Sequence, residues 1–242
     1  WAVASGARAV EAASAAPPII LAEALMALVS SMTEAGHTYT ESQPYLSRLS
    51  ELAPRLNSNH SRGIIAWTRG SAAFMAGRPE VGQAEYEQAR ELLDAKRDLR
   101  MWLRFHSISA RWRLNAGVLD GVQDLLATAS LGLQILGNNH DVVELRQVQA
   151  MYALRTDEPL EAARILSEML DDPVLGAENM SRGGTELILG HAFLALGRTE
   201  AARERYQRAA FQFEAEGRLR AAVDAWRRSV GQDSSTQFLT TA

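Results

Sequence analysis

The feature that most constrains this chain of 242 residues is an internal repeat with a period of about 40 residues. Glycine or aspartate recurs at steps of 41, 40, 40 and 40 residues, at Gly36, Gly77, Gly117, Asp157 and Gly197. Around the last four of these, other positions keep their size and polarity. Seven residues before stand Gly70, Ala110, Ala150 and Gly190; five after, Gly82, Val122, Ala162 and Ala202; nine after, Tyr86, Leu126, Leu166 and Tyr206; twelve after, Ala89, Ala129, Met169 and Ala209. A repeat of this length predicts stacked copies of one supersecondary unit.

Each copy is predicted to be a pair of helices joined by a tight turn. The recurring glycines can adopt the positive φ that ends a helix at little cost. Pro79 and Pro159 suit the first turn of a second helix, and Asp120 with Gln123 has the spacing of a capping box. The small residues of the repeat let paired helices approach closely, and the Tyr or Leu residues fill the remaining space. No alternating pattern typical of strands is present, so we predict an all-α fold.

The copy with the clearest pattern resembles the tetratricopeptide repeat (TPR). Its matching residues are Leu189, Gly190, Phe193, Gly197, Ala202, Tyr206 and Ala209, and Gly70, Gly77, Tyr86 and Ala89 form a similar set. The period is near 40 rather than about 34 residues, as in TPR variants with longer helices. The fourth copy, at about 138–170, departs further, with Asp157 at its turn and Met169 where a small residue is usual.

This resemblance implies a right-handed TPR-like superhelix of about five helix-turn-helix hairpins followed by a C-terminal capping helix. We predict one array over residues 1–231, with repeats at about 17–57, 59–95, 97–136, 138–170 and 175–216, a cap at 218–231 and a tail at 232–242. Because the chain starts at Trp1, halfway through a repeat, we expect it to continue a longer protein.

Composition and motifs argue against several classes of function. The chain has no cysteine, so it cannot form a disulfide, a thiol nucleophile or a cysteine zinc site. Its 25 basic and 29 acidic residues give a net charge of −4, which lacks the basic excess of a nucleic-acid-binding domain. No histidine pair has metal-ligand spacing, and no phosphate-binding or nucleophile motif occurs. We therefore expect no enzyme activity, cofactor or metal, and with neither a membrane span nor a secretion signal, a cytoplasmic protein.

One basic stripe stands out in this mildly acidic chain. Its residues, at steps of 3, 4, 3, 4 and 4 on one face of the helix before Gly117, are Arg97, Arg100, Arg104, Ser107, Arg111 and Asn115. From Lys96 to Arg113, six basic residues stand against one acidic residue. In one interpretation these arginines are solvated or pair with carboxylates of the next copy, such as Glu144. In the other they bind a carboxylate or phosphate, which the planar guanidinium can hold with two hydrogen bonds.

TPR geometry implies that the first helix of each pair lines a concave groove. Shifting the stripe by one repeat in either direction gives an apolar neighbour on one side and a mixed polar one on the other. The predicted groove residues are Trp67, Ser71, Met75, Arg104, Ser107, Arg111, Asn115, Gln147, Met151, Arg155 and His191. Trp67 and Met75 also suit a packed core. An apolar patch beside a basic one suits an extended peptide or a small acidic, amphipathic ligand.

Two functions remain open. The first is a sensor or interaction domain of a bacterial transcriptional regulator, as in regulators that join a helix-turn-helix to a TPR array. The second is a TPR scaffold or adaptor without a small ligand. Trp102, Phe105 and Trp112 lie off the basic stripe, so nucleic acid is expected only through a domain absent from this chain. Self-association is open, through Leu125, Leu133, Phe238 and Leu239.

Overall fold

The computed structural model describes residues 2–35, 37–175 and 182–231, and within these ranges it contains helices and no strand. The α-helices are α1 (Ala2–Ala12), α2 (Pro18–Glu34), α3 (Tyr39–Leu52), α4 (Asn59–Met75), α5 (Pro79–Leu92), α6 (Leu99–Asn115), α7 (Val122–Leu136), α8 (Asn139–Arg155), α9 (Pro159–Asp171), α10 (Arg182–Ala195), α11 (Thr199–Ala215) and α12 (Leu219–Ser229). Two short 3-10 helices follow α1 and α3, at Ala13–Ala15 and Ala53–Arg55. The all-α prediction is confirmed. Trp1, Gly36 and the predicted tail with Phe238 and Leu239 lie outside the described residues.

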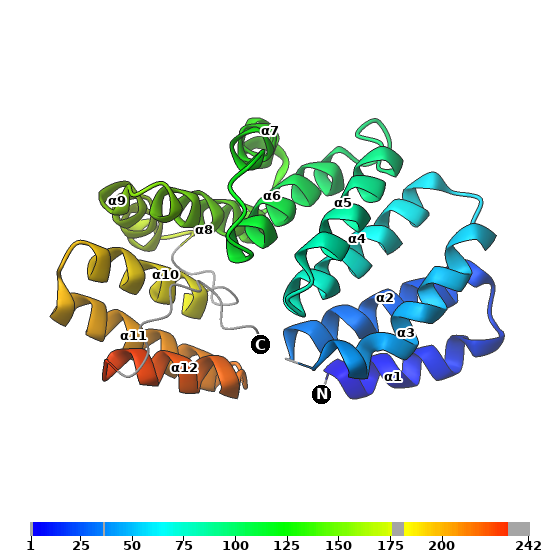
Figure 1. The fold of residues 1–242 in the computed structure, drawn as a ribbon, viewed down its shortest axis with the longest axis horizontal. Helices are drawn as coiled ribbons and strands as arrows, with labels where there is room; N and C mark the ends of the chain where they lie inside the picture. Colours follow the sequence, from blue (N-terminus) through cyan, green and yellow to red (C-terminus); the bar gives the residue numbers. More distant parts are fainter. Residues whose placement is uncertain (1, 36, 176–181, 232–242) are drawn as a thin grey trace. The chain divides into compact units, whose positions relative to one another are not determined.

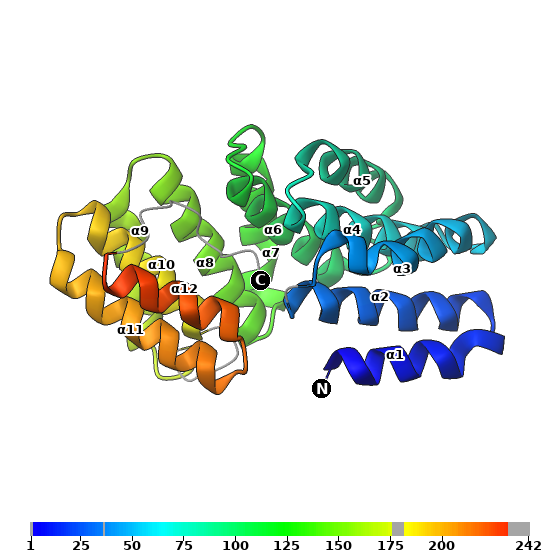
Figure 2. The same ribbon diagram turned by 60° about the horizontal axis from the view of Figure 1, so that its bottom comes forward.

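The described chain divides into two compact units, residues 2–99 and residues 100–231, and each is described by itself. In the first unit α1 packs on α2, α2 on α3 and α4, and α4 on α5 (Figure 1). In the second, consecutive helices from α7 to α12 pack on one another, and α8 also contacts α10. Figures 1 and 2 both show α10, α11 and α12 side by side. Most helices thus pack on their neighbours in the chain, as the repeat predicts, although the backbones of α6 and α7 are not among these close pairs.

Helix α6 joins the core of the second unit through its apolar side. Its buried residues Leu103, Ala110 and Leu114 belong to one cluster with residues of α7, α8, α9 and α10. Phe105 is 2% exposed, whereas Trp102 and Trp112 are half-buried, so the three aromatic residues of α6 are not arranged as an open stacking surface.

The turn between the two helices of each pair has the same geometry in four copies. Gly77, Gly117, Asp157 and Gly197 have φ of 67°, 78°, 63° and 72°. In every copy the amide after this residue donates to the carbonyl five residues earlier, at 2.8 or 2.9 Å. This closes the helix as in a Schellman motif. Asp157 is the one described non-glycine residue with positive φ, so it carries the conformational cost that glycine avoids.

The starts of the second helices follow the predicted chemistry in two copies and depart from it in one. Pro79 and Pro159 are the first residues of α5 and α9, where a missing N–H costs nothing. The predicted capping box of Asp120 and Gln123 is wrong. The N-cap of α7 is Gly121, in the left-handed region with φ of 68°, and it makes no side-chain cap. A second glycine, Gly121, thus occupies the N-cap position of α7. Asp120 lies one residue before this position and cannot cap the helix.

The close approach of paired helices is set by the small residue of the first helix and the large residue of the second. A Cβ on Gly190 would lie 2.5 Å from Cε1 of Tyr206, and a Cβ on Gly70 would overlap the ring of Tyr86. Both tyrosines are 3% exposed. The two rings thus occupy equivalent environments 120 residues apart in sequence, as the repeat predicts.

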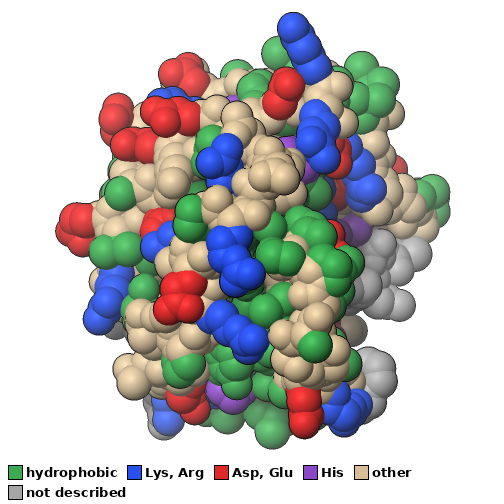
Figure 3. Space-filling model, turned by 90° about the vertical axis from the view of Figure 1, so that its right-hand side faces the viewer, with side chains coloured by type: hydrophobic (Ala, Val, Ile, Leu, Met, Phe, Trp, Pro, Cys, Tyr) green, Lys and Arg blue, Asp and Glu red, His purple; other side chains and the backbone are tan. Residues whose placement is uncertain are grey.

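The surface carries both signs of charge. On the face in Figure 3, Lys and Arg side chains are interspersed with Asp and Glu and with hydrophobic groups. Across the part of the chain that the structure describes, no helix combines the length and apolar character needed to cross a bilayer.

Candidate ligand-binding site

The basic stripe lies on α6, with one exception. Arg97 precedes the helix, which begins at Leu99, so the predicted first member of the stripe lies in the preceding turn. Arg100, Arg104, Ser107, Arg111 and Asn115 all lie on the helix.

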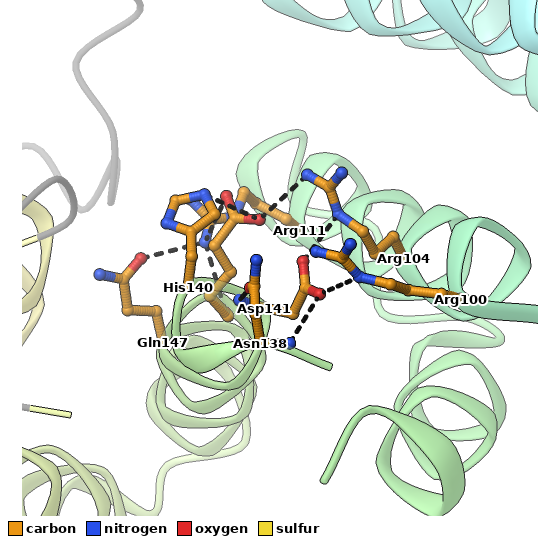
Figure 4. A network of polar contacts seen from close by, with 8 residues as sticks. Arg100, Arg104, Arg111, Asn138, His140, Asp141 and Gln147 are labelled. Carbon is orange, nitrogen blue, oxygen red and sulfur yellow. Dashed lines mark hydrogen bonds and ion pairs between the residues drawn. The ribbon is translucent and has the colours of Figure 1, made fainter. Parts of the chain in front are cut away.

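In the N-terminal part of the stripe, two arginines pair with one buried carboxylate (Figure 4). The side chain of Asp141, at the start of α8, is fully buried. Its Oδ2 atom lies 2.7 Å from Nε of Arg100, and its Oδ1 atom lies 2.9 Å from Nε of Arg104. Asp141 also closes the capping box of α8 with Asn138, accepting from the Asn138 amide at 3.2 Å. Arg100 and Arg104 thus pair with a carboxylate of the next copy, as in the first of the two interpretations.

A second acidic residue, Glu144, lies one helical turn further along α8. Its carboxylate is 3.8 Å from Arg104, 3.9 Å from Arg111 and 3.7 Å from His140. These distances exceed hydrogen-bond length, so Glu144 offsets charge across the interface without forming a close pair.

Arg111 is the most buried arginine of the stripe, with 12% of its side chain exposed. Its Nη2 atom donates to Oε1 of Gln147 at 3.0 Å and to the backbone carbonyl of Glu144 at 3.4 Å. Burial lowers the pKa of Arg111; the charge of Glu144 opposes this shift, and Arg218 adds to it. The guanidinium is thus a desolvated cation whose nearest carboxylate is 3.9 Å away.

Arg111 begins a row of buried polar side chains across three first helices, α6, α8 and α10. Gln147 of α8 is 2% exposed, and its Nε2 atom donates to Oγ1 of Thr185 on α10 at 2.9 Å. Thr185 is 1% exposed. We call Arg111, Gln147 and Thr185 the polar row. Apolar residues would pack here without desolvation cost, so a polar row at this interface favours a role beyond stability.

Two stripe residues beside the row have polar atoms without partners. Ser107 is 2% exposed and its Oγ atom makes no hydrogen bond. In Asn115 both side-chain amide atoms are buried and unpaired. Buried polar groups are nearly always satisfied in folded proteins, so each exception needs a physical explanation.

The remaining predicted groove residues have mixed surroundings. Met151 is fully buried in the core of the second unit. Arg155 is half-buried at the end of α8, and burial lowers its pKa. His191 and Ser71 both face the second helix of their own pair. His191 Nδ1 lies 3.1 Å from the hydroxyl of Tyr206, and Ser71 Oγ shares a 2.8 Å hydrogen bond with Tyr86.

The apolar end of the predicted groove lies in the other unit. Trp67, Ser71 and Met75 all belong to α4, where Trp67 and Met75 are half-buried. The structure therefore places eight predicted residues, from Arg104 to His191, in the second unit and three in the first. Their role in binding stays a prediction.

Sequence reasoning named Glu144 and Gln147 beside the stripe but missed Asp141 and Thr185. Asp141 follows Asn138 by three residues, the spacing of a capping box, so its place at the start of α8 was accessible from sequence. Thr185 and the buried Glu186, whose carboxylate lies 3.0 Å from Arg205, carry no such local signal. A cavity of about 360 Å³ in the second unit is lined by other residues, among them Gln134, Tyr152 and Arg164.

No protein-family model, curated protein or solved structure matches this chain. Function is therefore inferred from the chemistry of these residues.

Proposed function

We propose that the chain is a TPR-like, right-handed superhelical binding domain that recognises an acidic peptide or a small acidic, amphipathic ligand. In this proposal it serves as the cytoplasmic sensor domain of a bacterial transcriptional regulator, whose nucleic-acid contacts reside in another domain. The repeat and the basic stripe in the sequence support this proposal. Arg111 and the polar groups next to it are proposed to recognise the ligand.

The observation that carries the proposal is the combination at Arg111. A guanidinium with 12% of its side chain exposed lies one helical turn from the unpaired polar atoms of Ser107 on one side and Asn115 on the other. A carboxylate at this position would receive charge-assisted hydrogen bonds from Arg111 and further donors from Ser107 and the Asn115 amide. Arg100 and Arg104 already have Asp141 as their counter-ion, so the binding element is confined to the C-terminal half of α6.

Thermal stability provides a direct test, with citrate, inorganic phosphate and a peptide of alternating leucine and glutamate as probes. A probe at about 100 times its Kd stabilises the folded state by about 2.7 kcal/mol, which raises Tm by roughly 5–10 °C for a chain of this size. Arg111→Gln keeps an N–H group that can donate to Gln147 but removes the positive charge. The increase in Tm caused by the probe should therefore disappear. Arg113→Gln, the same change on another face of α6, should retain it.

A second variant separates binding from folding. Asn115→Leu removes amide atoms that have no partner in the structure, so the free protein should keep its stability while the probe-induced shift falls. If the probe raised Tm equally in the wild type, in Arg111→Gln and in Asn115→Leu, this site would be removed from the proposal.

A further inference from the structure

The last helix of the described chain carries an exposed apolar face. Leu219, Val223 and Val230 are 66%, 48% and 66% exposed, and half-buried Trp226 lies between them. At 100° per residue Leu219, Val223 and Trp226 span about 60° of the helix surface, and Val230 is the C-cap residue that follows the helix; we call these four residues the α12 stripe. Phe211 of α11, 60% exposed, extends the patch through an edge-to-face contact with Trp226 at 5.0 Å between ring centroids.

The opposite side of α12 shows how helices in this chain cover one another. Ala221, Ala222 and Ala225 are at most 4% exposed and pack α12 into a cluster with Tyr206 and Phe213 of α11. The α12 stripe presents a second apolar surface on another side of the same helix. Within α12 its spacing of 4 and 3 residues is that of a helix face which a neighbouring helix can cover.

The charged residues beside the α12 stripe favour a partner helix with acidic residues. Arg220 and Arg227, both exposed, lie on α12 about 70–90° from the centre of the stripe, along one flank. A partner helix with acidic residues on this flank would add carboxylates beside both guanidinium groups, each of which already has a contact within the chain. Asp224, which pairs with Arg227 at 3.8 Å, lies further from the stripe.

The same flank disfavours a second copy of this chain. In an antiparallel two-fold pair of α12 helices, like flanks face each other, so Arg220 of one copy would lie near Arg227 of the other. Like charges placed in this way are unfavourable. We propose that the α12 stripe docks an amphipathic helix of a partner protein, with apolar residues at i, i+3, i+4 and i+7 and Asp or Glu on its flank. This inference is independent of the function proposed for Arg111.

Fluorescence anisotropy with two labelled helical peptides tests the proposal. Both peptides are about four turns long and carry leucine on one face; one has glutamate on its flanks and the other has lysine. The full chain should bind the glutamate peptide at least about tenfold more tightly than the lysine peptide. Val223→Glu and Leu219→Glu should each weaken this binding by about tenfold or more. Leu160→Glu on α9 is the matched control, since Leu160 is also 66% exposed, and it should bind as the wild type does.

Arg227→Glu tests the charge argument, because it should reduce binding of the glutamate peptide and raise that of the lysine peptide. Circular dichroism checks that each variant stays helical. Equal binding of the two peptides, or equal binding by Val223→Glu and Leu160→Glu, would overturn the proposal. So would a Val223-dependent dimer in sedimentation, or Val223-dependent binding to phosphatidylserine vesicles, if the glutamate peptide did not bind.

Discussion

The fit between Gly190 and Tyr206 allows a quantitative test of the repeat. Gly190→Ala places a methyl group 2.5 Å from Cε1 and 2.7 Å from Cδ1 of a ring that is 3% exposed. The ring has to move, and its hydrogen bond to His191 is then lost or lengthened. Overpacking costs about 1–3 kcal/mol and the hydrogen bond about 1 kcal/mol, while alanine gains about 1 kcal/mol in helix propensity. We expect a net loss of about 1–3 kcal/mol.

The same helix provides the control. A Cβ on Gly184 would lie 3.5 Å from Nε2 of Gln147, an ordinary contact, although Gly184 is also buried. Gly184→Ala should therefore keep or raise stability, by up to about 1 kcal/mol. Urea unfolding followed by circular dichroism measures both variants, and a change in midpoint at constant m shows that only stability has changed.

A double-mutant cycle tests the cause of the effect. The copies that have alanine at the small position have leucine at the repeat position of the tyrosine, as in Ala110 with Leu126 and Ala150 with Leu166. Tyr206→Leu alone leaves a cavity and should cost about 2–4 kcal/mol. Combined with Gly190→Ala, it should cost less than the two single changes together, with a coupling of about 1–2 kcal/mol. Additive losses, or a Gly190→Ala variant as stable as Gly184→Ala, would refute the packing explanation.

Three further predictions concern turns and charges. Asp157→Gly should stabilise the protein by about 0.5–1 kcal/mol in urea unfolding, because Asp157 has φ of 63°, while Gly197→Asp should have the opposite effect. Asp141→Ala should cost about 2–3 kcal/mol, because it removes one of the two hydrogen bonds of the α8 capping box and the shared counter-ion of two arginines; Asp141→Asn, which can still accept from the Asn138 backbone N–H, should cost clearly less in the same assay. Burial raises the pKa of Glu85, with Arg69 opposing, so the folded state holds this proton more tightly than the unfolded chain. The stability of the wild type relative to Glu85→Gln should therefore fall as pH rises from about 4 to 7, and a difference constant with pH in unfolding titrations would contradict this.

The polar site was partly predictable. The position of the stripe on one face of α6 follows from its spacing, since a helix fixes which residues share a side. The state of each arginine does not follow from spacing. Arg100 and Arg104 share a carboxylate that lies about 40 residues further along the chain, whereas Arg111 is desolvated beside Gln147. Three arginines on one helix face therefore differ in whether a carboxylate lies close to them. This difference depends on which residues of α8 pack beside each arginine.

What the sequence by itself determined are the helix pairs, their turns and the matched small and large residues between them. These depend on interactions within a few residues, such as the positive φ at Gly77, or on a volume match between paired helices, such as Gly70 with Tyr86 and Gly190 with Tyr206. What only the tertiary structure decided is which polar groups are paired, which are buried without a partner and which apolar faces stay exposed. The physical reason is that desolvation and ion pairing depend on distances between helices, and the period of a sequence does not specify those distances.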